Sequence, residues 1–342
     1  MAKAACARLQ DEYFIRDKGL WAPKGQNPYD FWWTSAVALE AVIEYMTLTG
    51  DLKYVPVIDL VLKDDRNLVN SYYDDTCWWA ISCLRAYDYA IAQELPADDY
   101  LKKAIKAFEI VTEGWDDKCG GGIWWSADPN ADQIKGSIEN EQAIVVASRL
   151  HERVAKPERD YKKFAQDTWD WLASSNMIDA RHLVGNDVRP LKGCAVDMEP
   201  LYTYTNGVIL GALIDLWKVT GDPNLRVRAE QMAEASIVWF SNDDGVIQEH
   251  CELAEPPSCD KDQQMFKGIY VHYAGYLYSF YSNGVLDDKL RTFILKNADS
   301  IWKNARLVDQ FGVRWTGPYE SATLPTQISA LLALNQACRF QV

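Results

Sequence analysis

The hydrophobic positions of the chain repeat in a helical pattern that occurs six times. In each copy, small and apolar residues occupy nearly every side of the helix. The copies cover residues 32–48, 78–91, 139–154, 206–219, 268–281 and 326–338. A helix that is apolar all round is stable in water only when neighbouring elements cover it completely. The pattern therefore predicts six buried helices.

A second, amphipathic helix precedes each buried one, with apolar residues at i, i+3 and i+4 and charged residues elsewhere. These helices are predicted at residues 4–14, 52–67, 98–113, 158–174, 223–240 and 287–305. The tripeptide Thr-Gly-Asp, at 49–51 and again at 220–222, marks two of the junctions. Glycine ends one helix there, and aspartate caps the next. Because an amphipathic helix covers one side only, these six helices are expected to form an outer layer.

The alternation of the two helix types predicts an all-α protein with the fold of an (α/α)6 toroid, a barrel of six inner and six outer helices. We expect residues 1–342 to form one domain without a linker. β-rich sequence is scarce, and short strands are expected only in loops such as 120–125 and 312–315.

The loops that lead into the inner helices are the expected location of the functional site. All six inner helices of such a barrel run in the same direction, so these loops lie at one rim. They include Asp30, Trp33, Tyr72, Asp74, Asp75, Trp125, Asp187, Tyr204, Asn206, Asp262 and Lys267. Polar and aromatic groups from distant parts of the sequence thus converge, as they do in binding clefts.

Composition narrows the class of ligand. The chain has 14 Trp and 18 Tyr, and flat aromatic rings stack on the apolar faces of sugars, although core packing also uses such rings. The formal charge of −14 disfavours nucleic acid, because an acidic surface repels phosphates. No apolar run approaches the roughly 18 residues that a membrane span needs. We expect a monomer that binds carbohydrate, with no nucleic-acid partner and no membrane span.

The eight cysteines and four histidines argue for disulfides rather than a metal site. There is no CxxC pair, and the histidines lack metal-ligand spacing, so neither a metal nor a cofactor is expected. An even number of cysteines permits up to four disulfides, and Cys251 with Cys259, which bracket a short loop, is the predicted pair. Several buried free thiols are the alternative.

Familiar catalytic motifs of other enzyme classes are absent from the sequence. There is no GxSxG nucleophile elbow, no P-loop and no dinucleotide-binding GxGxxG motif after a strand. Carboxylates are therefore the remaining candidates for catalysis.

The most specific feature is the pair Asp74–Asp75 in the segment YYDDTCWW at 72–79. Neighbouring Cα atoms are about 3.8 Å apart, so divergent side chains would place the two carboxyls about 5–5.5 Å apart, the separation found in retaining glycosidases. Two acids this close favour a state in which one is ionised and the other protonated. In the alternative, Asp74 is merely solvated and Asp75 is a helix N-cap.

Several motifs together resemble glycoside hydrolase family 76, the endo-α-1,6-mannanases, and the likeness extends from about residue 21 to the C-terminus. The motifs are Tyr73-Asp74-Asp75, Trp78-Trp79-Ala80, Leu84-Arg85-Ala86-Tyr87, Gly121-Gly122-Ile123-Trp124-Trp125, Thr203-Tyr204, Asn206-Gly207 and Phe266-Lys267-Gly268-Ile269. The resemblance implies an (α/α)6 fold and retaining hydrolysis of internal α-1,6 linkages in mannan or manno-oligosaccharides. It also implies Asp74 as nucleophile and Asp75 as acid/base. Thr76 and Thr205 depart from the family pattern, which often has an acidic residue and Asn there.

Substrate contacts follow from the same family-like motifs. Asp187 and Asn206 are predicted to hydrogen-bond sugar hydroxyls, and Trp125 or Tyr73 to stack on a sugar ring. Tyr204 and Lys267 also fall on such motifs and are predicted to bind substrate. For the polar residues the alternative is a bond that fixes a loop, and for the rings it is core packing.

Four functions remain open. Besides a retaining hydrolase, the same site would serve a transglycosylase that acts on mannose-bearing cell-wall or anchor glycans, as some fungal family members do. A non-catalytic carbohydrate-binding toroid is the third, and an inverting enzyme that uses Asp75 with Asp197 or Glu199 is the fourth. We expect a fungal, secreted or cell-wall protein whose signal peptide lies outside the given sequence.

Overall fold

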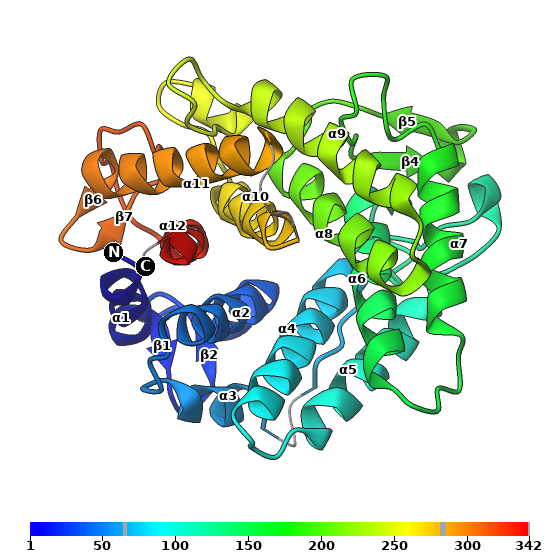
Figure 1. The fold of residues 1–342 in the computed structure, drawn as a ribbon, viewed down its shortest axis with the longest axis horizontal. Coiled ribbons are helices and arrows are strands. Elements are labelled where there is room, and N and C mark those ends of the chain that lie inside the picture. Colours follow the sequence, from blue (N-terminus) through cyan, green and yellow to red (C-terminus); the bar gives the residue numbers. More distant parts are fainter. Residues whose placement is uncertain (64–66, 281–284, 341–342) are drawn as a thin grey trace. The chain divides into compact units, whose positions relative to one another are not determined.

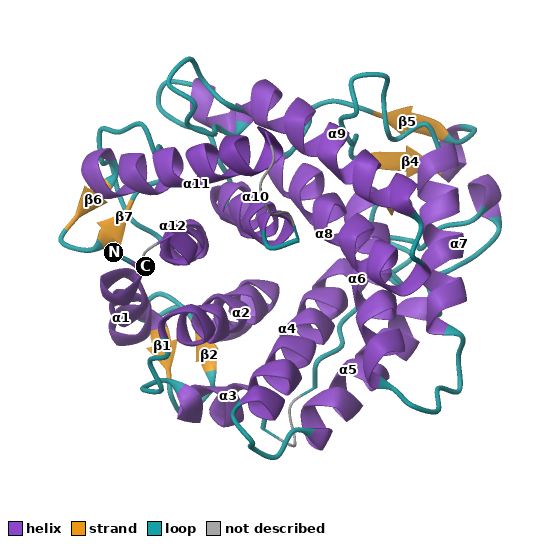
Figure 2. Ribbon diagram, in the orientation of Figure 1, coloured by secondary structure: helices purple, strands orange, loops and turns teal. Residues whose placement is uncertain are grey.

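The computed structural model describes residues 1–63, 67–280 and 285–340, and its regular secondary structure consists mainly of helices (Figures 1 and 2). The chain forms two compact units. Unit 1 comprises Met1–Arg66 and Ile237–Val342, and unit 2 comprises Asn67–Ser236. The expectation of a single domain therefore stays a prediction.

Unit 2 contains three buried helices, each followed by another helix. The buried helices are α4 (Tyr73–Ala92), α6 (Ser137–Arg153) and α8 (Thr203–Thr220). Their companions are α5 (Asp98–Thr112), α7 (Tyr161–Ser174) and α9 (Pro223–Phe240), whose last residues extend past the boundary of the unit. Short elements occupy the loops: η2 (Lys118–Gly120), β3 (Lys135–Gly136), β4 (Asp187–Arg189), η3 (Pro190–Lys192) and β5 (Ala195–Asp197).

Among its described residues, unit 1 also contains three buried helices and three further helices. Its buried helices are α2 (Trp32–Thr49), α10 (Gln263–Tyr278) and α12 (Leu324–Ala337), and its other helices are α1 (Ala2–Tyr13), α3 (Val55–Val61) and α11 (Val285–Asn304). The short elements are β1 (Phe14–Ile15), β2 (Leu20–Trp21), η1 (Pro28–Phe31), η4 (His250–Leu253), β6 (Arg306–Leu307), β7 (Gln310–Phe311) and η5 (Cys338–Phe340).

Burial separates the two helix types as the hydrophobic pattern predicts. Every residue of α2 from 34 to 46 is buried, and so is every residue of α6 from 137 to 150. In α5, by contrast, the buried positions Ala104, Ala107, Phe108 and Val111 follow the i, i+3, i+4, i+7 spacing of one face. In unit 2, α5 packs beside α4, and α7 packs beside α6 (Figure 1).

Some boundaries differ from the sequence prediction. Helix α4 begins at Tyr73, five residues before the predicted start, and therefore contains the aspartate pair. Helix α3 is limited to Val55–Val61, whereas residues 52–67 were predicted to be helical. Residues 64–66 of that prediction lie outside the described residues, and so does residue 281, the last residue of the helix predicted at 268–281. Neither predicted strand region, 120–125 or 312–315, forms a strand, although both are described. The strands pair instead beside the starts of helices and in the hairpins β1–β2 and β6–β7.

In unit 2, backbone hydrogen bonds bring the starts of the three buried helices together. The amide of Tyr73 donates to Trp125 O (3.0 Å), and the amide of Trp125 donates to Ile134 O (2.9 Å). The antiparallel sheet β3–β4–β5 then pairs Gly136 with Asp187. Three loops far apart in sequence thus meet where α4, α6 and α8 begin.

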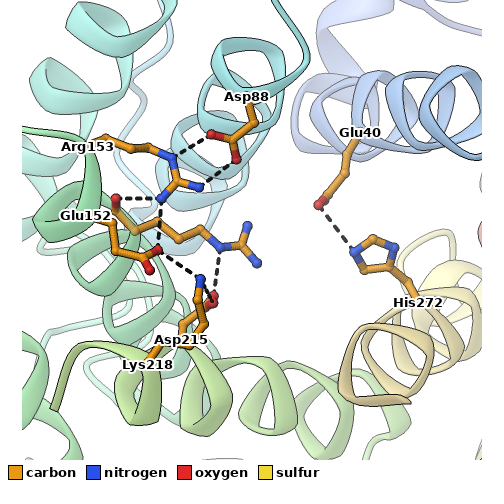
Figure 3. Close-up of polar contacts among 8 residues, drawn as sticks. Glu40, Asp88, Glu152, Arg153, Asp215, Lys218 and His272 are labelled. Atoms are coloured by element: carbon orange, nitrogen blue, oxygen red, sulfur yellow. Dashed lines mark hydrogen bonds and ion pairs between the residues drawn. The ribbon is translucent and has the colours of Figure 1, made fainter. Parts of the chain in front are cut away.

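Ion pairs join the same helices elsewhere in unit 2 (Figure 3). Arg149 Nε lies 2.7 Å from Asp215 Oδ2, which joins α6 to α8. Arg153 Nη2 lies 2.7 Å from Asp88 Oδ2, which joins α6 to α4. The Arg149–Asp215 pair is buried, and a buried charged pair is stable only with close geometry. It therefore constrains how α6 and α8 pack, while the partly exposed Arg153–Asp88 pair adds a contact between α6 and α4.

Two disulfides are present among the described residues. Cys251–Cys259 confirms the predicted pair, and Cys119–Cys194, which links the loop before α6 to the loop before α8, was not predicted. Cys6, Cys77 and Cys83 are buried free thiols, and Cys338 is also free. Among the described helices, none has the length and apolar character required to cross a membrane.

Candidate active site

Asp74 and Asp75 lie in the first turn of α4, and both are half-buried. The N-cap position is Tyr72, so the alternative in which Asp75 caps the helix is wrong. The partial positive charge of a helix N-terminus stabilises carboxylates in this turn. The start of α4 therefore holds two adjacent acids whose side chains are not required for capping.

Each aspartate has its own hydrogen-bond donor. The indole Nε1 of Trp125 donates to Asp74 Oδ2 (3.2 Å), and the amide Nδ2 of Asn70 donates to Asp75 Oδ2 (2.6 Å). Asn70 is itself fixed, because its Oδ1 accepts from the amide of Tyr72 (2.9 Å). Different donors on different segments hold the two carboxyls, as a divergent pair requires. The carboxyl separation of about 5–5.5 Å stays a prediction.

The two rings that were predicted to stack on sugar have different surroundings. Trp125 is half-buried, and its ring centroid lies 4.8 Å from that of Tyr72. Tyr73 is buried against Gly114, where a Cβ atom would come within 2.7 Å of its ring. Burial raises the pKa of the Tyr73 hydroxyl. Trp125 is thus the ring beside the aspartates, and Tyr73 packs inside the unit.

Asp187 on β4 is buried and paired with Arg189. Arg189 Nε lies 3.0 Å from Asp187 Oδ1, and its Nη2 lies 2.6 Å from Asp197 Oδ2. Burial raises the pKa of Asp187, and Arg189 opposes this rise. Asp197, the distant partner considered for an inverting enzyme, is thus engaged in an ion pair, whereas Glu199 is exposed.

Tyr204 and Asn206 lie in the first turn of α8. Asn206 is buried, and its side chain accepts from the amide of Val184 (2.9 Å) and donates to Tyr202 O (2.9 Å). Tyr204 is half-buried. Burial first, and then the charges of Asp74 and Glu139, raise the pKa of its hydroxyl. Asn206 therefore fixes a loop, whereas Tyr204 lies within the electrostatic field of Asp74.

Lys267 lies in α10 of unit 1 and is fully buried. Its Nζ lies 2.6 Å from Glu252 Oε1, donates to Val313 O (2.7 Å) and is 4.5 Å from the centre of the Trp315 ring. Burial lowers the pKa of Lys267, and Glu252 opposes this change. Its ammonium thus joins three segments of unit 1, and its predicted role in substrate binding stays a prediction.

Sequence reasoning missed Asn70 as the partner of Asp75, and it missed Glu139. Glu139 is fully buried in the first turn of α6, where its Oε1 accepts from the amide of Gly136. Burial and then the charge of Asp74 raise its pKa well above the usual range. The signal was the polar run at 139–142 at the start of a helix that is otherwise apolar on every side.

The curated relatives of the chain are fungal proteins named as mannan endo-1,6-alpha-mannosidases. The chain is 24% identical over 285 residues to mannan endo-1,6-alpha-mannosidase DCW1 of Saccharomyces cerevisiae, covering 78% of this chain and 62% of the relative. The curated fungal relatives are longer, and the chain spans 58–62% of their length.

Two solved structures extend the match to nearly the whole chain. An α-1,6-mannanase of Salegentibacter, an inactive variant with two consecutive aspartates replaced by asparagine and in complex with α-1,6-mannotriose, has a TM-score of 0.85 at 22% identity and covers 99% of this chain and 98% of its own. Dfg5 of Chaetomium thermophilum, in complex with glucosamine, has a TM-score of 0.82 at 18% identity. The match covers 100% of this chain and 90% of the Dfg5 chain.

These matches confirm the all-α, (α/α)6 toroid fold class predicted from the alternation of helix types. The sequence model of the family that the motifs resemble matches residues 1–341. The chain belongs to glycosyl hydrolase family 76.

Proposed function

We propose that this protein is a retaining, endo-acting glycosidase that cleaves α-1,6-linked mannose chains. The observation that carries the proposal is the adjacent pair Asp74–Asp75 in the first turn of α4, with Trp125 and Asn70 as separate donors. The similar Salegentibacter enzyme, which is inactive when two consecutive aspartates are replaced, supports this choice of pair.

The reaction proceeds in two steps. Asp74 attacks the anomeric carbon and forms a covalent glycosyl-enzyme, while Asp75 protonates the departing glycosidic oxygen. Asp75 then removes a proton from water, which attacks the same carbon and releases Asp74. The division of roles follows the family resemblance. The indole of Trp125 and the start of α4 both favour the ionised form of Asp74 that the first step needs.

The substrate-binding residues fall into two groups by their surroundings. Trp125 and Tyr204 are half-buried beside the aspartates, so we propose a stacking role for the first and a hydrogen-bonding role for the second. Asp187, Tyr73, Asn206 and Lys267 are buried. We propose that Asp187 binds sugar hydroxyls with Arg189 and that Tyr73 and Asn206 support the site by packing and by fixing a loop. The predicted substrate-binding role of Lys267, which lies in unit 1, stays a prediction.

The covalent intermediate can pass to water or to a second sugar. The fungal relatives and the glucosamine complex of Dfg5 motivate a test of the second outcome. α-1,6-Mannotetraose would be incubated with and without excess mannobiose or glucosamine, and the products followed by mass spectrometry and anomeric NMR. Shorter products whose reducing ends first form in the α configuration support the hydrolase. Longer products without new reducing ends make the enzyme a transglycosylase, and first products in the β configuration contradict retention.

Replacing Trp125 separates its hydrogen bond from its ring. Trp125→Phe keeps a ring but removes the donor to Asp74, and we expect kcat to fall about tenfold with little change in KM, as for loss of a bond to a charged group. Trp125→Ala is expected to raise KM as well. Trp124→Phe is the matched control, because the Trp124 ring lies over Lys118 and Lys135 instead. Equal kinetics of the Trp125→Phe variant and the parent would exclude this role.

We also propose a secreted or cell-wall location. Disulfides persist in oxidising compartments and are rare in the cytosol, and this chain has two. Expression with a secretory leader, followed by mass spectrometry under non-reducing conditions, checks whether both bonds form in the exported protein.

A further inference from the structure

The start of α6 is tied to the start of α4 by a short series of hydrogen bonds. Tyr73, the first residue of α4, donates to Trp125 O, and Trp125 donates to Ile134 O. Two residues later, the amide of Gly136 donates to Glu139 Oε1 in the first turn of α6. This series places Glu139 beside the segment that also supplies the indole donor of Asp74.

Glu139 has one carboxyl oxygen in use and one without a partner. Oε1 accepts from Gly136, while Oε2 is buried and makes no hydrogen bond to any of the residues that the structure describes. A glycine at 136 leaves room for this side chain, since a Cβ there would lie 2.5 Å from Oε2. A buried oxygen without a partner is costly, and more so if it is charged. Only one oxygen of the Glu139 carboxyl group thus takes part in capping α6, and the other is buried without a hydrogen bond to the described residues.

The titratable groups that interact electrostatically with Glu139 lie on three neighbouring elements and on its own helix. They are Asp74 and Cys77 on α4, Tyr204 on α8, Asp187 on β4, and Glu141. None of them is a cation, and Arg189 is already paired with Asp187 and Asp197. An ionised Glu139 would therefore be buried among acids without a counter-charge, a strongly unfavourable state.

We propose that Glu139 is a third carboxyl group of the candidate active site, a neutral acid whose Oε2 hydroxyl donates a hydrogen bond to Asp74. The inference rests on the proposed function in so far as Asp74 is the nucleophile. A neutral donor stabilises the ionised form of its acceptor and fixes its orientation. Glu139 is thus a positioning residue that acts on the substrate through Asp74.

A direct test measures the proton on Glu139 without any turnover. Glutamate labelled with ¹³C at Cδ would be followed by NMR through a pH titration, and the Glu139 signal assigned by its loss in Glu139→Gln. We expect Glu139 to be neutral at pH 7 and to titrate at lower pH in Asp74→Asn, because a neighbouring negative charge is gone. Asp75→Asn, which removes the adjacent acid that faces Asn70, is the matched control and is expected to shift Glu139 less. A glutamate that is ionised at pH 7, or that is indifferent to Asp74→Asn, overturns the proposal.

Kinetics test the hydrogen bond itself. Glu139→Gln retains an acceptor for Gly136 and a neutral donor, so kcat is expected within about threefold of the parent. Glu139→Ala is expected to lower kcat about 10- to 100-fold at nearly constant KM. It should also move the acid limb of the pH profile to higher pH, since ionised Asp74 loses a donor.

Asn140→Ala controls for damage to the start of α6. Asn140 is buried and bonds to Ile123 through both its amide and its carbonyl groups, but its side chain does not titrate. We expect a lower Tm and an unmoved acid limb for this variant. If Glu139→Ala leaves the limb in place, or if Asn140→Ala moves it equally, Glu139 is only structural. If the parent fails to cleave mannotetraose while the NMR result holds, the proposed function fails and the pairing of Glu139 with Asp74 stands.

Discussion

Asp74→Asn is expected to reduce kcat on α-1,6-mannotetraose by about 10³-fold or more. Asparagine preserves the shape of the side chain at the start of α4 but cannot form the covalent intermediate. Binding should persist, because Trp125 and Tyr204 are unchanged. The measurement is steady-state kinetics together with calorimetric binding of the tetraose. A variant with parental turnover would make Asp74 a bystander, whereas equal binding of the tetraose without turnover in either protein would favour the non-catalytic carbohydrate-binding alternative.

Azide distinguishes the role of Asp74 from that of Asp75. With α-mannobiosyl fluoride, whose leaving group needs no acid, Asp75→Ala is expected to form the intermediate rapidly and then stall. Added azide should release it as the α-azide. In Asp74→Ala, azide would instead displace fluoride directly and give the β-azide. The opposite pairing of products would exchange the two roles, and the β-azide from neither variant would argue against a nucleophile at 74.

The sequence pattern predicted the buried and amphipathic helices because burial itself generates the pattern. Positions 34–46 of α2 are buried on every side, and most of them are small or apolar. The start of α4 shows where the pattern is insufficient. Its first turn is polar, so the apolar run begins at Trp78, whereas the helix begins at Tyr73. Capping and dipole effects, which have no hydrophobic period, determine such starts.

The residues of the candidate site also divide into those that the sequence could identify and those that it could not. The pair Asp74–Asp75 could be found from sequence because adjacent acids between aromatic pairs are a local signal. The surroundings of Asn206 and Lys267 could not, because their partners Val184 and Glu252 lie in other loops. Cys119–Cys194 joins residues 75 apart, and spacing alone cannot choose among so many pairings.

Unit 1 contains a buried histidine between two glutamates, and its charge makes stability depend on pH. His272 Nδ1 on α10 lies 2.7 Å from Glu44 Oε2 on α2. Its Nε2 lies 3.4 Å from Glu40 Oε1, a contact shown in Figure 3. Gln336 of α12 and Arg339 of η5 also contact Glu44. Burial alone would lower the pKa of His272, but the charges of Glu44 and Glu40 outweigh it and raise the pKa to about 9.

His272→Gln is expected to destabilise the protein below pH 6.5 by about 3 kcal/mol, the value of a pKa raised from about 6.5 to about 9. Because the folded protein binds this proton more tightly than the unfolded chain, the stabilisation is complete below pH 6.5 and is lost as pH rises through 9. The difference in the free energy of unfolding between parent and variant should therefore shrink between these values. Urea unfolding at pH 6, 7.5 and 9.5 measures it, with His151→Gln, at an exposed histidine, as the matched control. A difference that stays constant with pH would mean that His272 has the same pKa in the folded and unfolded protein, and it would contradict the raised pKa.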